Sequence, residues 1–108
     1  MNKANFFSKL TIDSGNEIFE ILAENNYVMI ERITSFGQST PKGEWYDQDT
    51  NEWVILLQGS AGIIFDGEPT IHLLNPGDYM LIPAHKRHRV EFTDKYNPSL
   101  WLAVHFKD

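Results

Sequence analysis

The chain has 108 residues, of which 42 % are hydrophobic and 13 % aromatic, a formal net charge of −6 and no cysteine. This length suffices for one packed domain, and the composition excludes a disordered chain, disulfides, thiolate metal sites and cysteine nucleophiles. The negative charge and the lack of a long basic run argue against nucleic acid as a partner. No segment approaches the roughly 20 apolar residues of a membrane span, so we expect a soluble, cytoplasmic protein without a membrane partner.

Residues 1–16 show no strand pattern, and we expect them to form an extension that packs on the rest of the domain or on a dimer partner. From residue 17 onward, short runs rich in Val, Ile, Phe, Trp and Leu are separated by Gly, Pro, Asn and Asp. This pattern predicts strands near residues 17–22, 27–34, 52–58, 60–65, 69–73, 78–82, 87–92 and 99–106. The many short strands and the lack of a long helix predict a single all-β domain over residues 1–108, an antiparallel sandwich or closed barrel.

Two glycine steps predict specific turns. Asp66-Gly67 follows an apolar run and is typical of a two-residue β-hairpin loop, because both positions tolerate positive φ. Gln58-Gly59 interrupts an apolar strand, which indicates a bulge or a tight corner.

Side-chain alternation predicts which residues of two strands point inward. In residues 87–92, His88, Val90 and Phe92 share one face, while Arg and Glu side chains occupy the other. In residues 52–58, Glu52 shares a face with apolar side chains, but the opposite face, which carries Trp53, is apolar too. That outer face must be covered, either by the N-terminal extension or by another subunit, and a homodimer is the simpler expectation.

Two motifs in this chain resemble those of the cupin superfamily, and the resemblance covers roughly residues 43–106. Glu52-x6-Gly59 is similar to the second half of the first cupin motif. Gly77-x5-Pro83-x-His85-x2-His88 is similar to the second motif, which has the form G-x5-P-x-G-x2-H. The resemblance implies a small single-domain cupin with a double-stranded β-helix, or jelly-roll barrel, and a central cavity.

The resemblance also implies a divalent metal site inside the barrel. Family members bind the ion with two histidines and a glutamate of the first motif and one histidine of the second. Glu52 matches the glutamate and His88 matches the second-motif histidine. The paired histidines should stand at 46 and 48, or at 45 and 47, but the sequence there reads Trp45, Tyr46, Asp47 and Gln48. Loss of two imidazoles weakens a transition-metal site and changes its preferred metal.

A further departure places a histidine, His85, where the second motif has glycine, three residues before His88. One interpretation is therefore a metal site of Glu52, His85 and His88, completed by Asp47 or Gln48, for Zn, Ni, Mn or Fe. A second is a metal-free polar pocket in which Glu52 and His88 form a charge-assisted hydrogen bond. A third is a purely structural buried pair. All three rest on the cost of burying an unpaired carboxylate, which amounts to several kcal/mol.

Three more residues are candidates for lining the pocket: Trp45 and Tyr46 at the barrel mouth and His105 in the last strand, each with packing or surface exposure as the alternative. The sequence accordingly predicts a small cupin that binds a divalent metal ion and a small polar molecule, and that is a candidate metalloenzyme. A non-catalytic, metal-free ligand-binding or sensor module is the alternative. The fold does not choose between them.

Overall fold

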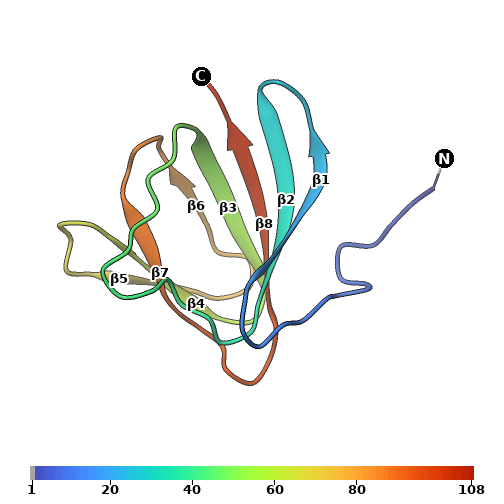
Figure 1. The fold of residues 1–108 in the computed structure, drawn as a ribbon, viewed down its shortest axis with the longest axis horizontal. Coiled ribbons are helices and arrows are strands. Elements are labelled where there is room, and N and C mark those ends of the chain that lie inside the picture. Colours follow the sequence, from blue (N-terminus) through green and yellow to red (C-terminus); the bar gives the residue numbers. More distant parts are fainter. Residues whose placement is uncertain (1) are drawn as a thin grey trace.

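A computed structural model describes residues 2–108 and consists of eight antiparallel β-strands in two facing sheets (Figure 1). The larger sheet has the strand order β1-β2-β8-β3-β6 and the smaller has the order β5-β4-β7. The strands are β1 (Ile18–Glu24), β2 (Val28–Ser35), β3 (Asn51–Gln58), β4 (Ala61–Phe65), β5 (Ile71–Leu74), β6 (Tyr79–Ile82), β7 (His88–Thr93) and β8 (Ser99–Phe106). The predicted all-β, antiparallel jelly roll is confirmed, and every predicted strand is present with its ends within two residues of those observed.

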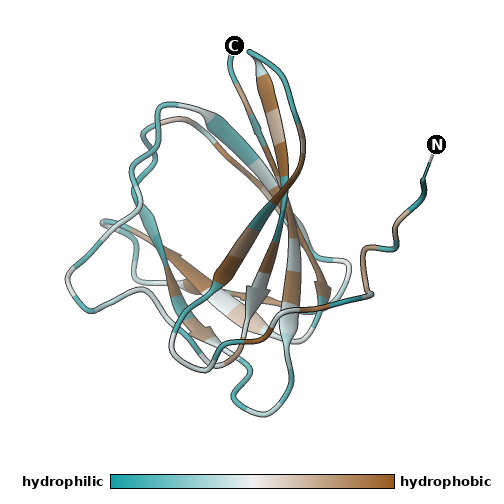
Figure 2. Ribbon diagram, turned by 45° about the vertical axis from the view of Figure 1, so that its right-hand side comes forward, coloured by the Kyte–Doolittle hydropathy of each residue, from teal (hydrophilic) through white to brown (hydrophobic). Residues whose placement is uncertain are grey.

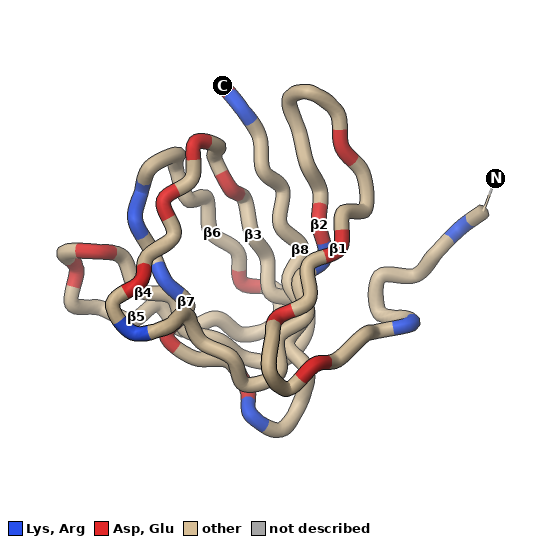
Figure 3. Tube along the Cα trace, in the orientation of Figure 1, with Lys and Arg blue, Asp and Glu red and all other residues tan. Residues whose placement is uncertain are grey.

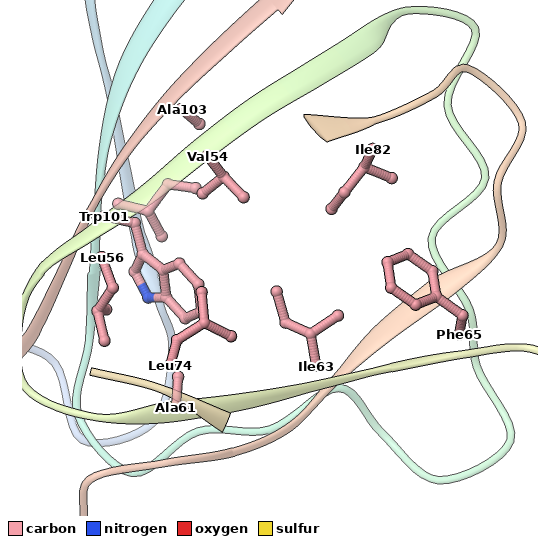
Figure 4. Packing of buried hydrophobic residues seen from close by; sticks show 10 residues of the cluster. Val54, Leu56, Ala61, Ile63, Phe65, Leu74, Ile82, Trp101 and Ala103 are labelled. Atoms are coloured by element: carbon pink, nitrogen blue, oxygen red, sulfur yellow. The ribbon is translucent and has the colours of Figure 1, made fainter. Parts of the chain in front are cut away.

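The core lies between the two sheets and is built by alternation along the strands. On β3, Val54 and Leu56 are buried and point inward, with Glu52 on the same face. They meet Ile63 from the smaller sheet and Trp101 from β8 in one apolar cluster (Figure 4). Hydrophobic stretches are concentrated in the strands, and the connecting loops are mostly hydrophilic (Figure 2). One end of this core carries the polar side chains described below.

Gly59 forms the predicted irregularity between β3 and β4. The pairing of β3 with β8 shifts register between Leu56 and Gln58, and Gly59 follows with φ +89°. A Cβ atom at Gly59 would lie 2.3 Å from Oγ of Ser99 and 2.7 Å from its Cα. Only glycine fits here, because the backbone is left-handed and a neighbouring strand passes directly beside it.

The two-residue hairpin predicted at Asp66-Gly67 is wrong. β4 ends at Phe65 and β5 begins at Ile71, so the loop has five residues, 66–70. A turn does close at the glycine, with Glu68 N donating to Phe65 O at 3.1 Å. Pro69 then follows, and because proline has no N–H to give to a β-ladder, pairing resumes only at Ile71.

The prediction that Phe92 points into the core is also wrong. Gly62 pairs with Phe92, whereas the next residue, Ile63, pairs with Val90, so Glu91 is an extra residue in β7. Such a bulge reverses the alternation beyond it. Phe92 is consequently 38 % exposed, and Thr93 is buried in its place.

The N-terminal residues run away from the barrel along one side (Figure 1). Their main attachment is Arg32 of β2, whose Nη1 donates to the carbonyl oxygens of Phe6 at 2.8 Å and Ser8 at 2.9 Å. The same guanidinium forms a two-oxygen ion pair with Glu20 of β1. This arrangement satisfies the guanidinium of Arg32, a residue that is only 6 % exposed.

Candidate functional site

A small cavity of about 60 Å³ lies between the sheets, and half of the side chains that line it are polar. Four of these polar side chains are both ionisable and buried, namely Glu31, Glu52, His88 and His105. Buried ionisable groups are costly unless they are paired, so a cluster of four is characteristic of a functional site.

Glu52 and His88 come together in the cavity from opposite sheets. Glu52 lies on the inner face of β3, and His88 begins β7. Oε1 of Glu52 is 3.7 Å from Nε2 of His88, and the two residues are 7 % and 5 % exposed. Burial raises the pKa of Glu52, and the nearby imidazoles of His105 and His88 counteract part of that rise.

The other ring nitrogen fixes the orientation of His88. Nδ1 lies 2.8 Å from the carbonyl oxygen of Lys86, which can only accept a hydrogen bond, so Nδ1 carries a proton. Nε2 faces Glu52 at a distance too long for a hydrogen bond. In the neutral ring, the Nε2 lone pair is therefore available to a ligand in the cavity, an arrangement common among metal-binding histidines.

His105 and Glu31 form a second pair in the same cavity. Nε2 of His105 is 2.7 Å from Oε1 of Glu31, and both side chains are 9 % exposed. This hydrogen bond is the main cause of a raised pKa at His105. His105 also pairs directly with Glu52 in the β3–β8 ladder, which places the two Glu–His pairs side by side.

Glu31 is a site residue that sequence reasoning missed. It lies on the inner face of β2 between Met29 and Ile33, but both faces of residues 28–35 mix polar and apolar side chains. The alternation therefore leaves the inward face of this strand undetermined. The only signal in the sequence was the spacing of Glu31, two residues from Met29 and two from Ile33 in a predicted strand. An acidic residue at such a position is also typical of a solvent-exposed strand face.

His85 and Asp47 pair with each other at the barrel mouth rather than with Glu52 and His88. Nδ1 of His85 is 2.8 Å from Oδ1 of Asp47, and the two side chains are 68 % and 49 % exposed. His85 has φ +63°, which fits the glycine that the family motif has at this position. Its backbone N donates to the carbonyl oxygen of Gln48 at 2.7 Å, so the turn is anchored to the loop before β3.

An open groove of about 590 Å³ outside the barrel contains this exposed pair. Glu31, Gln48 and His105 line both the groove and the inner cavity. We infer that a ligand reaches the cavity through this groove.

Tyr46 lines the cavity, whereas Trp45 packs on the outside. Tyr46 and His88 are joined by two backbone hydrogen bonds, and their rings stack with centroids 5.6 Å apart. Trp45 instead lies against the guanidinium groups of Arg87 and Arg89, 5.8 and 5.9 Å from its ring centroid. Burial and several nearby carboxylates raise the pKa of Tyr46, so its hydroxyl stays protonated and can donate a hydrogen bond.

Two of the cavity side chains, Glu52 and His88, have donor atoms placed to bind one divalent ion. Glu52 Oε1 and His88 Nε2 are 3.7 Å apart, close to the separation of roughly 3–3.5 Å between two ligands of one Zn²⁺ ion. Tyr46 and Gln48 stand where a metal-binding cupin would supply histidines. Across residues 2–108, no group of three or more His, Asp or Glu side chains is already gathered around one point in a way that could hold a metal ion.

The family model for the cupin domain matches residues 35–105. The chain belongs to the cupin family. This cupin is similar over its whole length to a crystal structure from Ralstonia eutropha JMP134, described as a "putative mannose-6-phosphate isomerase". The two chains are 42 % identical, each covers 100 % of the other, and the TM-score is 0.95.

Two further solved structures share the fold with this cupin. A cupin superfamily protein from Desulfitobacterium hafniense DCB-2 is 24 % identical with a TM-score of 0.74, covering 92 % of this chain and 84 % of its own. An RmlC-like cupin from Desulfovibrio desulfuricans is 17 % identical with a TM-score of 0.75, covering 97 % and 96 %. None of the curated proteins matches the chain. Residues 2–108 include no helix that could span a membrane.

Proposed function

We propose that this cupin binds a divalent metal ion through Glu52 and His88 and holds a small polar molecule beside it in the cavity. The observation that carries this proposal is the buried approach of the Glu52 carboxylate to Nε2 of His88, at 3.7 Å with no hydrogen bond between them. A carboxylate in this position needs a proton or a cation. The ordinary donor preferences of Zn, Ni, Mn and Fe suit one imidazole and one carboxylate as part of a ligand set.

The charge of the cavity supports a cation as the occupant. Three carboxylates, Glu17, Glu31 and Glu52, line the cavity together with two imidazoles, and no lysine or arginine of the described chain lines it. Burial raises the pKa of both Glu17 and Glu52, which means that the cavity as it stands disfavours its own negative charge. A bound cation would offset this cost for Glu52.

The remaining polar side chains suit proton transfer and ligand orientation. A divalent ion supplies polarisation of a bound oxygen. Glu31 and His105 form a hydrogen-bonded pair that can hold or release a proton at Nε2 of His105, and the Tyr46 hydroxyl can donate a hydrogen bond. The relative from Ralstonia eutropha is described as a putative sugar-phosphate isomerase, and an isomerisation of that kind needs a group to move a proton. We propose the Glu31–His105 pair for that role here.

Metal content separates the buried site from the exposed histidine. Protein purified without a chelator or a histidine tag should contain close to one equivalent of metal by elemental analysis. His88→Gln and Glu52→Gln should lose it, and His85→Gln should keep it, because His85 is paired with Asp47 at the surface. Trace metal in the wild type, or equal loss in His85→Gln and His88→Gln, would contradict the proposal.

A second candidate is metal-free binding of a small polar molecule. It is favoured by Tyr46 and Gln48, which line the cavity at the two histidine positions of the family motif and offer hydrogen bonds instead of imidazole ligands. This candidate predicts that the melting temperature stays unchanged when Zn, Ni, Mn or Fe is added. A rise that disappears in His88→Gln would instead support the metal site.

We also propose that the protein forms a homodimer through the outer face of the larger sheet. Trp53 and Ile55 of β3 point outward there and are only half-buried. Tyr79 and Leu81, their partners on β6, are 65 % and 59 % exposed. A continuous apolar sheet face of this kind is typical of an interface between subunits.

A further inference from the structure

Glu17 is a cavity carboxylate that the proposed metal site does not use. It lies directly before β1 and lines the cavity, with its side chain half-buried. The Ser35 hydroxyl donates to Oε2 of Glu17 at 2.6 Å, and the Trp101 indole Nε1 donates to Oγ of Ser35 at 3.1 Å. Trp101, Ser35 and Glu17, from three parts of the polypeptide, thus form one continuous row of hydrogen bonds that ends at Glu17.

This row of hydrogen bonds fixes what Glu17 presents to the cavity. Ser35 is fully buried and Trp101 is 3 % exposed, so neither has water as an alternative partner. The hydroxyl of Ser35 has a single proton, and because its oxygen accepts from Trp101, that proton points to Glu17. Oε2 of Glu17 is held as an acceptor, and Oε1 has no protein hydrogen bond among the described residues.

The strand register separates the backbone of Glu17 from that of Glu52 along the inner face. Glu52 pairs with His105, and His105 pairs with Met29 of β2. Ser35, the partner of Glu17, is six residues farther along β2, about 20 Å between backbone positions. The backbones of Glu17 and Glu52 therefore lie at different positions along the inner face, and Glu17 is not gathered with Glu52 and His88 into one set of metal ligands.

No lysine or arginine among the described residues lines the cavity, so no basic side chain attracts an anion from inside it to the Glu17 end. The basic residues near β7, which gather along one edge in Figure 3, each have a carboxylate partner outside the barrel. Lys86 pairs with Glu68 at 3.0 Å, and Arg87 pairs with Asp66 at 2.9 Å. Arg89 lies 3.3 Å from Glu91. A phosphate or carboxylate at Glu17 would meet like charge beside the apolar walls of Phe19 and Trp101.

We propose that Glu17 is a ligand-recognition residue and that the cavity takes a small molecule presenting a cationic hydrogen-bond donor, of the amidine or ammonium class, to it. The inference rests on the proposed binding of a small polar molecule in this cavity and adds the charge of the group that is recognised. Ser35 and Trp101 act as positioning residues, because their hydrogen bonds orient the Glu17 carboxylate through Oε2 and do not involve Oε1. A neutral donor binds more weakly, and an anion is rejected.

Three molecules of the same shape test the sign of the charge: acetamidinium, acetamide and acetate. Each is titrated into the full-length protein while the Trp101 indole N–H is followed by ¹H–¹⁵N NMR, with Trp101→Phe used to assign the peak. Acetamidinium should give a saturable shift, and acetate should bind at least about tenfold more weakly. Glu17→Gln should reduce the affinity for acetamidinium at least about fivefold and abolish the preference over acetate.

Glu24→Gln is the matched control, because Glu24 is exposed at the far end of β1, the strand that Glu17 precedes, and does not line the cavity. It should bind acetamidinium like the wild type. Equal or tighter binding of acetate, unchanged affinity in a folded Glu17→Gln protein, or no shift with any of the three molecules would overturn the inference. Metal uptake measured on the same samples tests Glu52 and His88 separately, since Glu52→Gln should lose the metal and keep the preference for acetamidinium.

Discussion

The imidazole of His105 is held by Glu31, a residue 74 positions earlier in the chain. Nε2 of His105 lies 2.7 Å from Oε1 of Glu31. Both side chains are buried, and β2 and β8 hold them in adjacent positions of one sheet. Two Glu–His pairs consequently face a single cavity, one within a sheet and one between the sheets.

Glu31→Gln should lower the pKa of His105 toward its ordinary value of 6.5. The hydrogen bond from Glu31 is the first cause of the raised pKa, and glutamine retains the shape but removes the charge. In the wild type, this pair stabilises the fold fully below pH 6.5, and the contribution disappears as the pH rises through the raised pKa. NMR titration of the metal-free protein measures the midpoint directly, and an unchanged midpoint in Glu31→Gln would refute the assignment.

The free energy of unfolding of Glu52→Gln, relative to that of the wild type, should increase as the pH rises. Burial raises the pKa of Glu52 above its ordinary value of 4.5, so the folded protein keeps this proton when the unfolded chain has lost it. The wild type, free of metal, therefore loses stability as the pH rises from 4.5 through the raised pKa, and the glutamine variant has no such loss. Urea denaturation from about pH 4 to about pH 7 measures the difference. A difference that stays constant or shrinks with pH would show that Glu52 is not desolvated.

Gly59→Ala and Gly67→Ala should differ sharply although both glycines have positive φ. A Cβ at Gly59 collides with the backbone of Ser99, whereas a Cβ at Gly67, with φ +81°, has nothing within 4 Å. Gly67→Ala should cost only the backbone strain, about 1 kcal/mol. Gly59→Ala adds a clash, and we expect a loss of about 3 kcal/mol or more. Denaturant unfolding of the two variants compares them, and equal losses would contradict the close approach of β8.

Leu81→Glu should dissociate the proposed dimer. Leu81 is exposed on the outer face of the larger sheet, where a charge would be buried against the partner. Leu73→Glu is the control, because Leu73 is 67 % exposed on the smaller sheet. Light scattering after size exclusion should give the wild type and Leu73→Glu twice the chain mass of 12.5 kDa, and Leu81→Glu the chain mass itself. A monomeric wild type would remove the proposal.

The sequence predicts most of this fold because its strands are punctuated by Gly, Pro and Asn and alternate clearly. Glu52 and His88 are predictable for the same reason, since each lies on a face shared with apolar side chains. Phe92 is not predictable, because the bulge at Glu91 depends on how β7 pairs with β4 and leaves no local signal. Glu31 and Glu17 are likewise set by tertiary structure, since strand β2 shows no clear apolar face and Glu17 precedes the first strand.

The fate of His85 shows a related limit of sequence reasoning. Its spacing from His88 is compatible with a shared ligand site, but its left-handed backbone turns the imidazole to Asp47 at the surface. Spacing along the chain fixes which residues are near one another, and backbone conformation decides whether they converge.

The central claim concerns a cation between Glu52 and His88, and anomalous diffraction from crystals grown with Mn²⁺ or Zn²⁺ tests it most directly. The account predicts one strong anomalous peak inside the barrel, about 2.0–2.2 Å from Nε2 of His88 and from a carboxylate oxygen of Glu52. An empty cavity in those crystals, or a peak only at the exposed His85–Asp47 pair, would contradict it.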